Sequence, residues 1–211
     1  MKAETFFNGE DQQKISAIIG MVEKKTAGEV AVMVVDHSDT YPEAQILAGI
    51  LLGGLISIGI ADRFFDDSLW SFIPLAIFFA VLVGTATGYI PPIKRFFIPS
   101  SRLEDQVRTR AVRAFYEKGL HKTRDGTGVL FFISLFEHKV WILADQGIYS
   151  RIEKEQLNTF VQEIAAAIRS GNTADVLYVS IQKVGDLLAR HFPVKSDDQN
   201  ELPDQVFIEE G

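Results

Sequence analysis

Two long stretches without charged residues lie back to back in the first half of the chain, and they constrain its fold more than any other feature. Residues 44–61 contain Gln45 as their one strongly polar residue, and residues 68–93 carry no charge. A helix needs about 20 residues to cross the hydrocarbon core of a bilayer, so both stretches are long enough. We therefore predict a transmembrane helical hairpin over residues 44–93.

The ends of these stretches carry residues typical of membrane interfaces. The aromatic residues Tyr41, Trp70 and Tyr89 stand near the expected boundaries, and Pro91-Pro92 ends the second stretch. We expect the two spans at about 44–61 and 69–90, joined by a short polar loop. The alternative is a pair of buried core helices, which is rare for two adjacent segments of this length.

The basic residues predict the orientation of the hairpin. The loop between the spans contains one Arg among three Asp, whereas Lys94, Arg95 and Arg102 follow the second span. Basic residues concentrate on the cytoplasmic side of a membrane. We therefore expect an integral membrane protein whose folded domain faces the cytoplasm. The same three basic residues are candidates for contact with anionic lipid headgroups.

An even number of spans returns the chain to the side that it left. Residues 1–43 provide one helix and one strand, too little to form a core alone. We therefore predict one discontinuous domain made of residues 1–43 and 94–194, with the hairpin as an insertion. Residues 195–211 are acidic and lack periodicity, so we expect a mobile tail there.

Hydrophobic periodicity predicts the elements of this domain. Continuous apolar runs at 30–35 and 129–135 indicate strands that are covered on both faces, and 139–144 follows the second run too closely for a crossover. The helical patterns have the spacing i, i+3, i+4 and i+7. They lie around residues 15–22, 103–115, 157–168 and 174–188. The predicted fold is α/β, with a small mixed β-sheet flanked by helices.

Charge and composition exclude several classes of protein. The net charge is −7, from 21 basic and 28 acidic side chains, which argues against binding to nucleic acid. The chain has no cysteine, so thiol catalysis, Cys-ligated metals and disulfides are excluded. It also lacks the Walker loop, the Gly-x-Ser-x-Gly elbow and the His-Glu-x-x-His motif. No catalytic nucleophile is evident.

Three carboxylates are placed together by the expected strand directions. If the first two strands are parallel and the third is antiparallel, the residues Glu29, Asp125 and Asp145 lie at one end of the sheet. Neighbouring carboxylates repel one another unless a cation neutralises them, and hard oxygen ligands favour Ca²⁺, with Mg²⁺ as the alternative. We predict a metal site of these three residues. The alternative is that the Asp-Gly and Asp-x-Gly sequences are only turns.

Several of these segments together resemble the TPM domain family. The segments are Gly28–Val34 and Gly126–Phe131, each after an amphipathic helix, then Asp145–Ile148, and finally His191-Phe192-Pro193. The segment 200–204 is similar to a tail common in bacterial members. This resemblance implies a compact α/β domain, calcium binding in some members and weak acid phosphatase activity in others. The family includes a thylakoid-lumen protein linked to photosystem repair and an animal receptor modulator.

The resemblance implies that Asp125 and Asp145 are the main metal ligands and that Glu29 is a further candidate. This chain departs from the simplest family pattern, because its hairpin follows the first strand instead of anchoring a terminus. The main hypothesis is a membrane-anchored module that binds divalent cations or a partner protein, with a role in membrane-protein assembly or maintenance implied by the resemblance. The alternatives are a metal-assisted phosphomonoesterase and a sensor of the lipid surface.

Overall fold

The computed structural model describes residues 2–65, 69–170, 172–194, 201–203 and 205–209. The chain divides into two compact units. The first, here called the α/β unit, consists of Met1–Ser38 and Glu104–Gly211. The second, here called the hairpin unit, consists of Asp39–Leu103. The hairpin unit is thus an insertion between the first strand and the rest of the α/β unit. Its boundaries lie five and ten residues outside the predicted 44–93.

The α/β unit contains a four-stranded mixed sheet in the order β3-β2-β1-β4. Its strands are β1 (Glu29–Val35), β2 (Gly128–Ser134), β3 (Lys139–Ala144) and β4 (Val206–Glu209). β1 is parallel to β2 and to β4, and β2 is antiparallel to β3. The predicted fold class and the directions of the first three strands are therefore confirmed.

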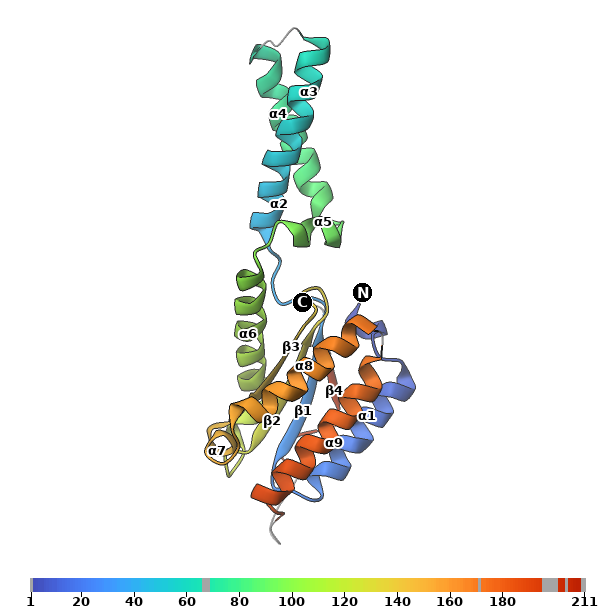
Figure 1. Ribbon diagram of the computed structural model, residues 1–211, viewed down its shortest axis with the longest axis vertical. Coiled ribbons are helices and arrows are strands. Elements are labelled where there is room, and N and C mark those ends of the chain that lie inside the picture. The colour runs from blue at the N-terminus through green and yellow to red at the C-terminus, as the bar shows by residue number, and fades with distance from the viewer. Residues whose placement is uncertain (1, 66–68, 171, 195–200, 204, 210–211) are drawn as a thin grey trace. The chain divides into compact units, whose positions relative to one another are not determined.

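Helices cover both faces of this sheet (Figure 1). One face carries α1 (Gly9–Glu23), α8 (Lys154–Ser170) and α9 (Thr173–His191), and the other carries α6 (Ser100–Glu117). All seven residues of β1 and of β2 are buried, because alternate side chains enter the two cores. Shorter elements are the 3-10 turns η1 (Ala3–Thr5) and η3 (Leu120–Lys122), and the one-turn helix α7 (Gln146–Tyr149).

Close packing of helix on helix explains one glycine in this unit. A Cβ added at Gly185 of α9 would lie 2.4 Å from Cγ2 of Val22 and 2.5 Å from its Cγ1. Gly185 and Val22 are both buried. The close approach of α1 and α9 therefore requires a residue without a side chain at position 185.

The strand β4 differs from the sequence-based expectation. Residues 195–211 were expected to form a mobile acidic tail, but Val206–Glu209 pairs with Val32–Val35 of β1. The apolar residues of β4 are only three, too few for a periodic signal, and their partner strand lies more than 170 residues earlier in the chain. Other parts of the expected tail, residues 195–200, 204 and 210–211, lie outside the described residues.

The hairpin unit contains two long apolar helices. The first, Pro42–Phe64, is built from α2 (Pro42–Ala48), the π-helical turn η2 (Gly49–Gly53) and α3 (Gly54–Phe64), and the second is α4 (Leu69–Gly88). The short helix α5 (Pro91–Phe96) follows. Both long helices have the length and composition needed to cross a membrane.

Glycines allow these two helices to approach each other closely. A Cβ at Gly49 would lie 2.3 Å from the carbonyl oxygen of Ala80, and a Cβ at Gly53 would lie 2.6 Å from the carbonyl carbon of Phe79. A Cβ at Gly84 would lie 3.0 Å from the carbonyl oxygen of Gln45. Gly49, Gly53 and Gly84 thus form the contact between the helices.

Candidate functional site

The three predicted carboxylates lie at the same end of the sheet. Glu29 opens β1 in register with Gly128, the first residue of β2. Asp145 follows β3, and its backbone N–H donates to the carbonyl of Gly128 at 2.9 Å. Asp125 belongs to the turn that precedes β2. The strand directions therefore bring Glu29 and Asp145 to this end, as the sequence predicted.

The two Asp-Gly-type turns at this end pack tightly on each other. A Cβ at Gly147 would lie 2.5 Å from the carbonyl oxygen of Gly126 and 2.6 Å from that of Asp125. Gly126 has a φ of +64°, in the left-handed region that favours glycine. A Cβ at Gly126 would also lie 3.7 Å from Oδ2 of Asp145. The glycines therefore permit close contact between the loop before β2 and the loop after β3.

The predicted carboxylates bind backbone groups of this chain. Asp145 caps α7, because its Oδ1 accepts from the N–H of Gln146 at 2.6 Å. The buried Glu29 accepts from the N–H of Glu201 at 3.1 Å. Among the described residues, no three His, Asp or Glu side chains are grouped so that they could hold a metal ion. Cation binding by Glu29, Asp125 and Asp145 therefore stays a prediction.

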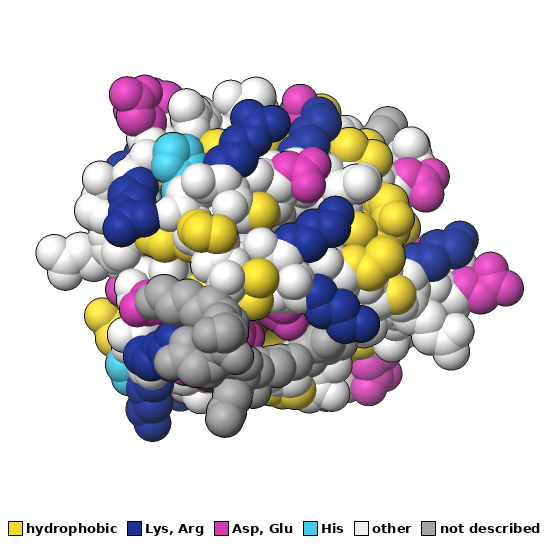
Figure 2. Space-filling model, turned by 90° about the horizontal axis from the view of Figure 1, so that it is seen from below, with side chains coloured by type: hydrophobic (Ala, Val, Ile, Leu, Met, Phe, Trp, Pro, Cys, Tyr) yellow, Lys and Arg dark blue, Asp and Glu magenta, His cyan; other side chains and the backbone are white. Residues whose placement is uncertain are grey.

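Charges of both signs are interspersed on the face that Figure 2 shows. Figure 2 views the molecule from below, the side on which α7 lies in Figure 1. Lys and Arg side chains alternate there with acidic and apolar ones. Interspersed charges of this kind do not select strongly for one sign of ligand.

The opposite end of the sheet holds a buried polar cluster that sequence analysis missed. The hydroxyl of Ser134 donates to the carboxylate of Glu137 and lies 2.8 Å from the hydroxyl of Ser38. Glu137 also accepts from the backbone N–H of Ser38 at 2.9 Å. Ser134 and Glu137 are fully buried. Ser134 ends β2, and polar residues at the carboxyl ends of parallel strands were the signal that could have revealed this cluster.

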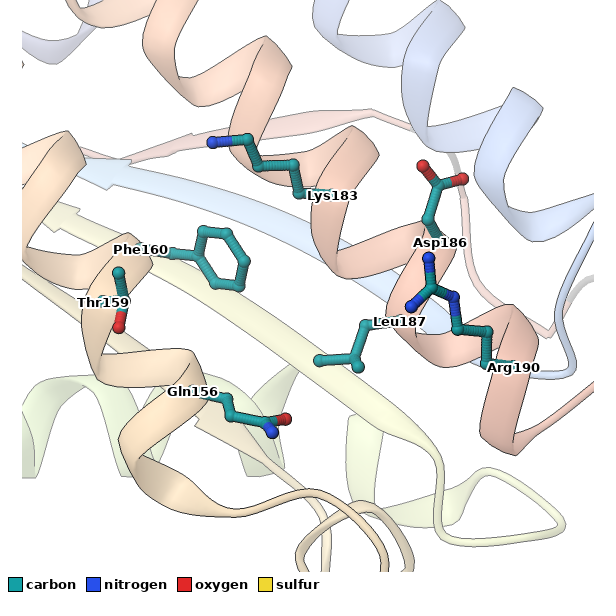
Figure 3. Close-up of a pocket in the computed structure, with 7 residues that line it drawn as sticks. All are labelled: Gln156, Thr159, Phe160, Lys183, Asp186, Leu187 and Arg190. Carbon is teal, nitrogen blue, oxygen red and sulfur yellow. The ribbon is translucent and has the colours of Figure 1, made fainter.

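A groove between α8 and α9 is a second surface of the α/β unit on which a ligand could bind. It encloses about 450 Å³ and is lined by Gln156, Thr159, Phe160, Lys183, Asp186, Leu187 and Arg190. Phe160 of α8 and Leu187 of α9 point toward each other across it, and both are half-buried (Figure 3). The groove therefore has an apolar floor with charged side chains along the α9 side.

Ion pairs gather on α6 and at β4. Nε of Arg113 donates to Glu117 at 2.7 Å, and Arg110 donates to the other oxygen of Glu117 at 3.1 Å. The hydrogen bond from Arg113, followed by that from Arg110, lowers the pKa of Glu117 below its ordinary value. Arg110 and Lys118 also pair with Glu209 of β4. Sequence analysis did not predict the pairs with Glu209, because they join residues 99 and 91 positions apart.

The lipid-surface candidates lie in the hairpin unit, and one of them is engaged within it. Arg102 pairs with Asp39 at 2.8 Å and with Glu43 at 2.9 Å. The hydrogen bond to Glu43 raises the pKa of Arg102 above its ordinary value. Lys94 and Arg95 belong to α5, and Nζ of Lys94 lies 5.9 Å from the ring centroid of the buried Tyr41. Of the three candidates, Arg102 thus has the clearest structural role.

Comparison with known proteins agrees with this architecture. The family model described as TPM_phosphatase, TPM domain, matches residues 96–187. The NMR structure of the BA42 protein from the psychrophilic bacterium Bizionia argentinensis is similar to the whole chain. The TM-score is 0.61 at 21% sequence identity, and the alignment covers 99% of this chain and 97% of that one. This likeness shows the fold. No curated protein matches the chain.

Proposed function

We propose that this chain is a membrane-anchored TPM-like module whose α/β unit binds a partner protein at the cytoplasmic surface of the bilayer. The observation that carries the anchoring is the exposure of apolar side chains along both long helices. The most apolar 18-residue window of Pro42–Phe64 is 33% buried, and that of Leu69–Gly88 is 6% buried. A core helix of a soluble protein would be mostly buried.

The exposed residues of these helices are large and numerous. Leu55 is 65% exposed, Ile77 63% and Val81 63%. Soluble monomers rarely expose continuous apolar patches of more than a few hundred Å². Hydrocarbon solvates such side chains favourably, and both helices keep their backbone hydrogen bonds internal, as a membrane span requires.

Aromatic and basic residues at the helix ends support the orientation. Trp70 is 89% exposed at the start of α4, and Tyr89 is 88% exposed directly after its end. Amphipathic rings favour the level of the lipid headgroups. Lys94 and Arg95 follow Tyr89 within six residues. The excess of basic residues on this side favours a cytoplasmic α/β unit.

The match to the TPM domain and the α8–α9 groove support a binding role. The matched residues 96–187 run from the end of α5 into α9, and so include all of α8 and every groove residue except Arg190. An apolar floor flanked by polar groups is typical of a binding surface. Assembly or maintenance of membrane proteins is the role that the family resemblance suggests for such a module.

Extraction and labelling experiments test the anchoring and the orientation. We expect the chain to stay in the membrane pellet after alkaline carbonate and to be released by detergent. Because the chain has no cysteine, single substitutions report topology without background. A membrane-impermeant maleimide added to intact cells should label Arg63→Cys, beside the loop, and leave Ser150→Cys unlabelled until the cells are lysed. Release by carbonate, or labelling of Ser150→Cys in intact cells, would contradict the proposal.

Under the same hypothesis, we propose that the α/β unit binds a ligand of a second kind, and that this ligand is a divalent cation. It is supported by the contact between the Asp125-Gly126 turn and the Asp145–Gly147 turn, and by the family resemblance. Calorimetric titration of Ca²⁺, then Mg²⁺, into the full chain in detergent tests it. Saturable binding that Asp125→Asn and Asp145→Asn abolish, and that Glu4→Gln leaves unchanged, would support a cation site. Absence of binding to the folded chain would leave both residues as turn formers.

A phosphatase is the second candidate function, because the matching family model is described as TPM_phosphatase. Hydrolysis of a generic phosphomonoester by the full chain, with and without divalent cations, tests it. We expect no cation-dependent hydrolysis above that of the Asp125→Asn, Asp145→Asn double variant. Robust turnover that is lost in the double variant would replace the binding role by this activity.

A further inference from the structure

The outer edge of β1 is covered by a strand from the far end of the chain. Val32 to Val35 of β1 are in parallel register with Val206 to Glu209 of β4 (Figure 1). The other edge of β1 pairs with β2 along its whole length, so this edge is where β1 can pair with a further strand. An uncovered edge would leave a row of N–H and C=O groups that pairs readily with another strand.

The side chains of β4 enter two different cores. Val206 and Ile208 pack against the core beneath α1, α8 and α9, whereas Phe207 packs against the core beneath α6. Nζ of Lys118 lies 4.6 Å from the centroid of the Phe207 ring. The edge of β1 therefore accommodates an extended segment whose apolar side chains point to alternate faces of the sheet, as sites of strand addition do.

Arg110 of α6 and Lys118, the residue after α6, bind the carboxylate at the end of β4. Nζ of Lys118 donates to Glu209 at 2.8 Å, and Arg110 donates to the second oxygen of the same carboxylate. The side chains of Arg110 and Lys118 are 18% and 22% exposed. Partly buried, convergent cations of this kind select an acidic residue at one position of the segment.

β4 itself is a short strand. It has four residues, all of them half-buried, and it pairs with only the second half of β1. β4 lies at the edge of the sheet order, so its departure leaves the pairing of β3 with β2 and of β2 with β1 unchanged. Short edge segments with little buried surface open at low free-energy cost.

We propose that the outer edge of β1, together with Arg110 and Lys118, is a strand-addition site, and that β4 fills it within the chain. The partner that this site fits is an extended protein segment with apolar residues at three successive positions, facing alternate sides, followed by Asp or Glu. The proposal rests on the binding role proposed above and adds a second surface, apart from the α8–α9 groove, together with the chemistry of its partner. β4 competes with that partner for the site.

A labelled peptide with the sequence of residues 205–211 tests this site. Fluorescence anisotropy measures the affinity of the peptide for the full chain in detergent. The same measurement is made on the double variant Phe207→Asp, Glu209→Lys, in which the pairing of β4 with β1 is weakened. We expect at least tenfold tighter binding to the variant. The matched control, Val179→Asp with Glu4→Lys, changes two exposed residues in the same way elsewhere and should bind like the unmodified chain.

Charge reversal tests the two cations. A chain with Arg110→Glu and Lys118→Glu should lose affinity for the peptide at least tenfold and regain it for a peptide that carries Lys in place of Glu209. Equal affinity of the unmodified chain and the weakened-strand variant, or absence of binding to a folded variant, would overturn the proposal. The unmodified chain could also form a dimer that the double substitution Phe207→Asp, Glu209→Lys converts to a monomer. That result would overturn the proposal, because β4 of one copy would then pair with β1 of the other.

Hydrogen exchange in the unmodified chain tests the release of β4 without any substitution. The amides of Val206–Glu209 should exchange at least tenfold faster than those of β2. Exchange as slow as that of β2 would overturn the proposal, because a partner can pair with β1 only when β4 has dissociated from it. These measurements do not depend on membrane insertion, so they fail or succeed separately from the anchoring experiments.

Discussion

The carboxylate of Glu137 accepts a hydrogen bond from the backbone N–H of Ser38 across 99 positions of sequence, at 2.9 Å. Ser38 is the last residue of the α/β unit before the hairpin unit begins. Glu137 follows β2 in the short turn to β3, so its side chain ties the exit of β1 to the neighbouring strand. This contact fixes the backbone at the point where the chain leaves the sheet.

Removal of this carboxylate should destabilise the α/β unit. In Glu137→Ala, the N–H of Ser38 and the buried hydroxyl of Ser134 lose their acceptor, which costs about 1–3 kcal/mol of unfolding free energy. Urea denaturation of the full chain in detergent measures the loss. Glu4→Ala, at an exposed position, should change stability by less than about 0.5 kcal/mol. Equal effects of the two substitutions would contradict the structural role of Glu137.

A side chain at position 185 should force α1 and α9 apart. Gly185→Ala places a methyl group against both Cγ atoms of Val22, and overpacking of this kind costs about 1–3 kcal/mol. The added substitution Val22→Ala makes room for the methyl group, so the double variant should be more stable than the sum of the two single changes predicts. Gly9→Ala, where the added group meets nothing within 4 Å, serves as the control in thermal unfolding.

Neighbouring glycines of the hairpin unit should respond very differently to substitution. Gly53→Leu would collide with the backbone of α4, whereas Gly54→Leu points into open space. We expect Gly53→Leu to lower the thermal unfolding midpoint in detergent micelles and Gly54→Leu to leave it nearly unchanged. Similar midpoints for both variants would show that the two helices are not in close contact.

Acid should reduce the stability that the ion pairs of Glu117 contribute to the folded chain. The pKa of Glu117 is lower in the folded chain than the ordinary 4.5, so the unfolded chain binds its proton more readily. The resulting stabilisation is complete above about pH 4.5 and is lost as the pH falls through the folded-state pKa. Because the side chain is 39% exposed, the effect is at most about 1 kcal/mol. Glu117→Gln should remove it, as measured by urea unfolding between pH 3 and pH 7, and an unchanged pH slope would contradict this origin.

Local patterns account for the parts of the fold that the sequence predicted. The apolar runs that form β1 and β2 are buried along their whole length. The two long uncharged stretches became Pro42–Phe64 and Leu69–Gly88, within four residues of the expected ends. Each of these features depends on residues that are close together in the chain, so a window of the sequence contains the necessary information.

The parts of the fold that the sequence did not predict depend on pairing between residues that are far apart in the chain. The sequence by itself determined the apolar hairpin, the buried strands and the end of the sheet at which Glu29 and Asp145 lie. Only the tertiary structure decided that β4 covers β1, that Glu209 meets Arg110 and Lys118, and that Glu137 binds Ser38. The physical reason is that a polar side chain shows no periodicity that reveals its partner. Which donor or cation it meets depends on how segments almost 100 or more positions apart come together.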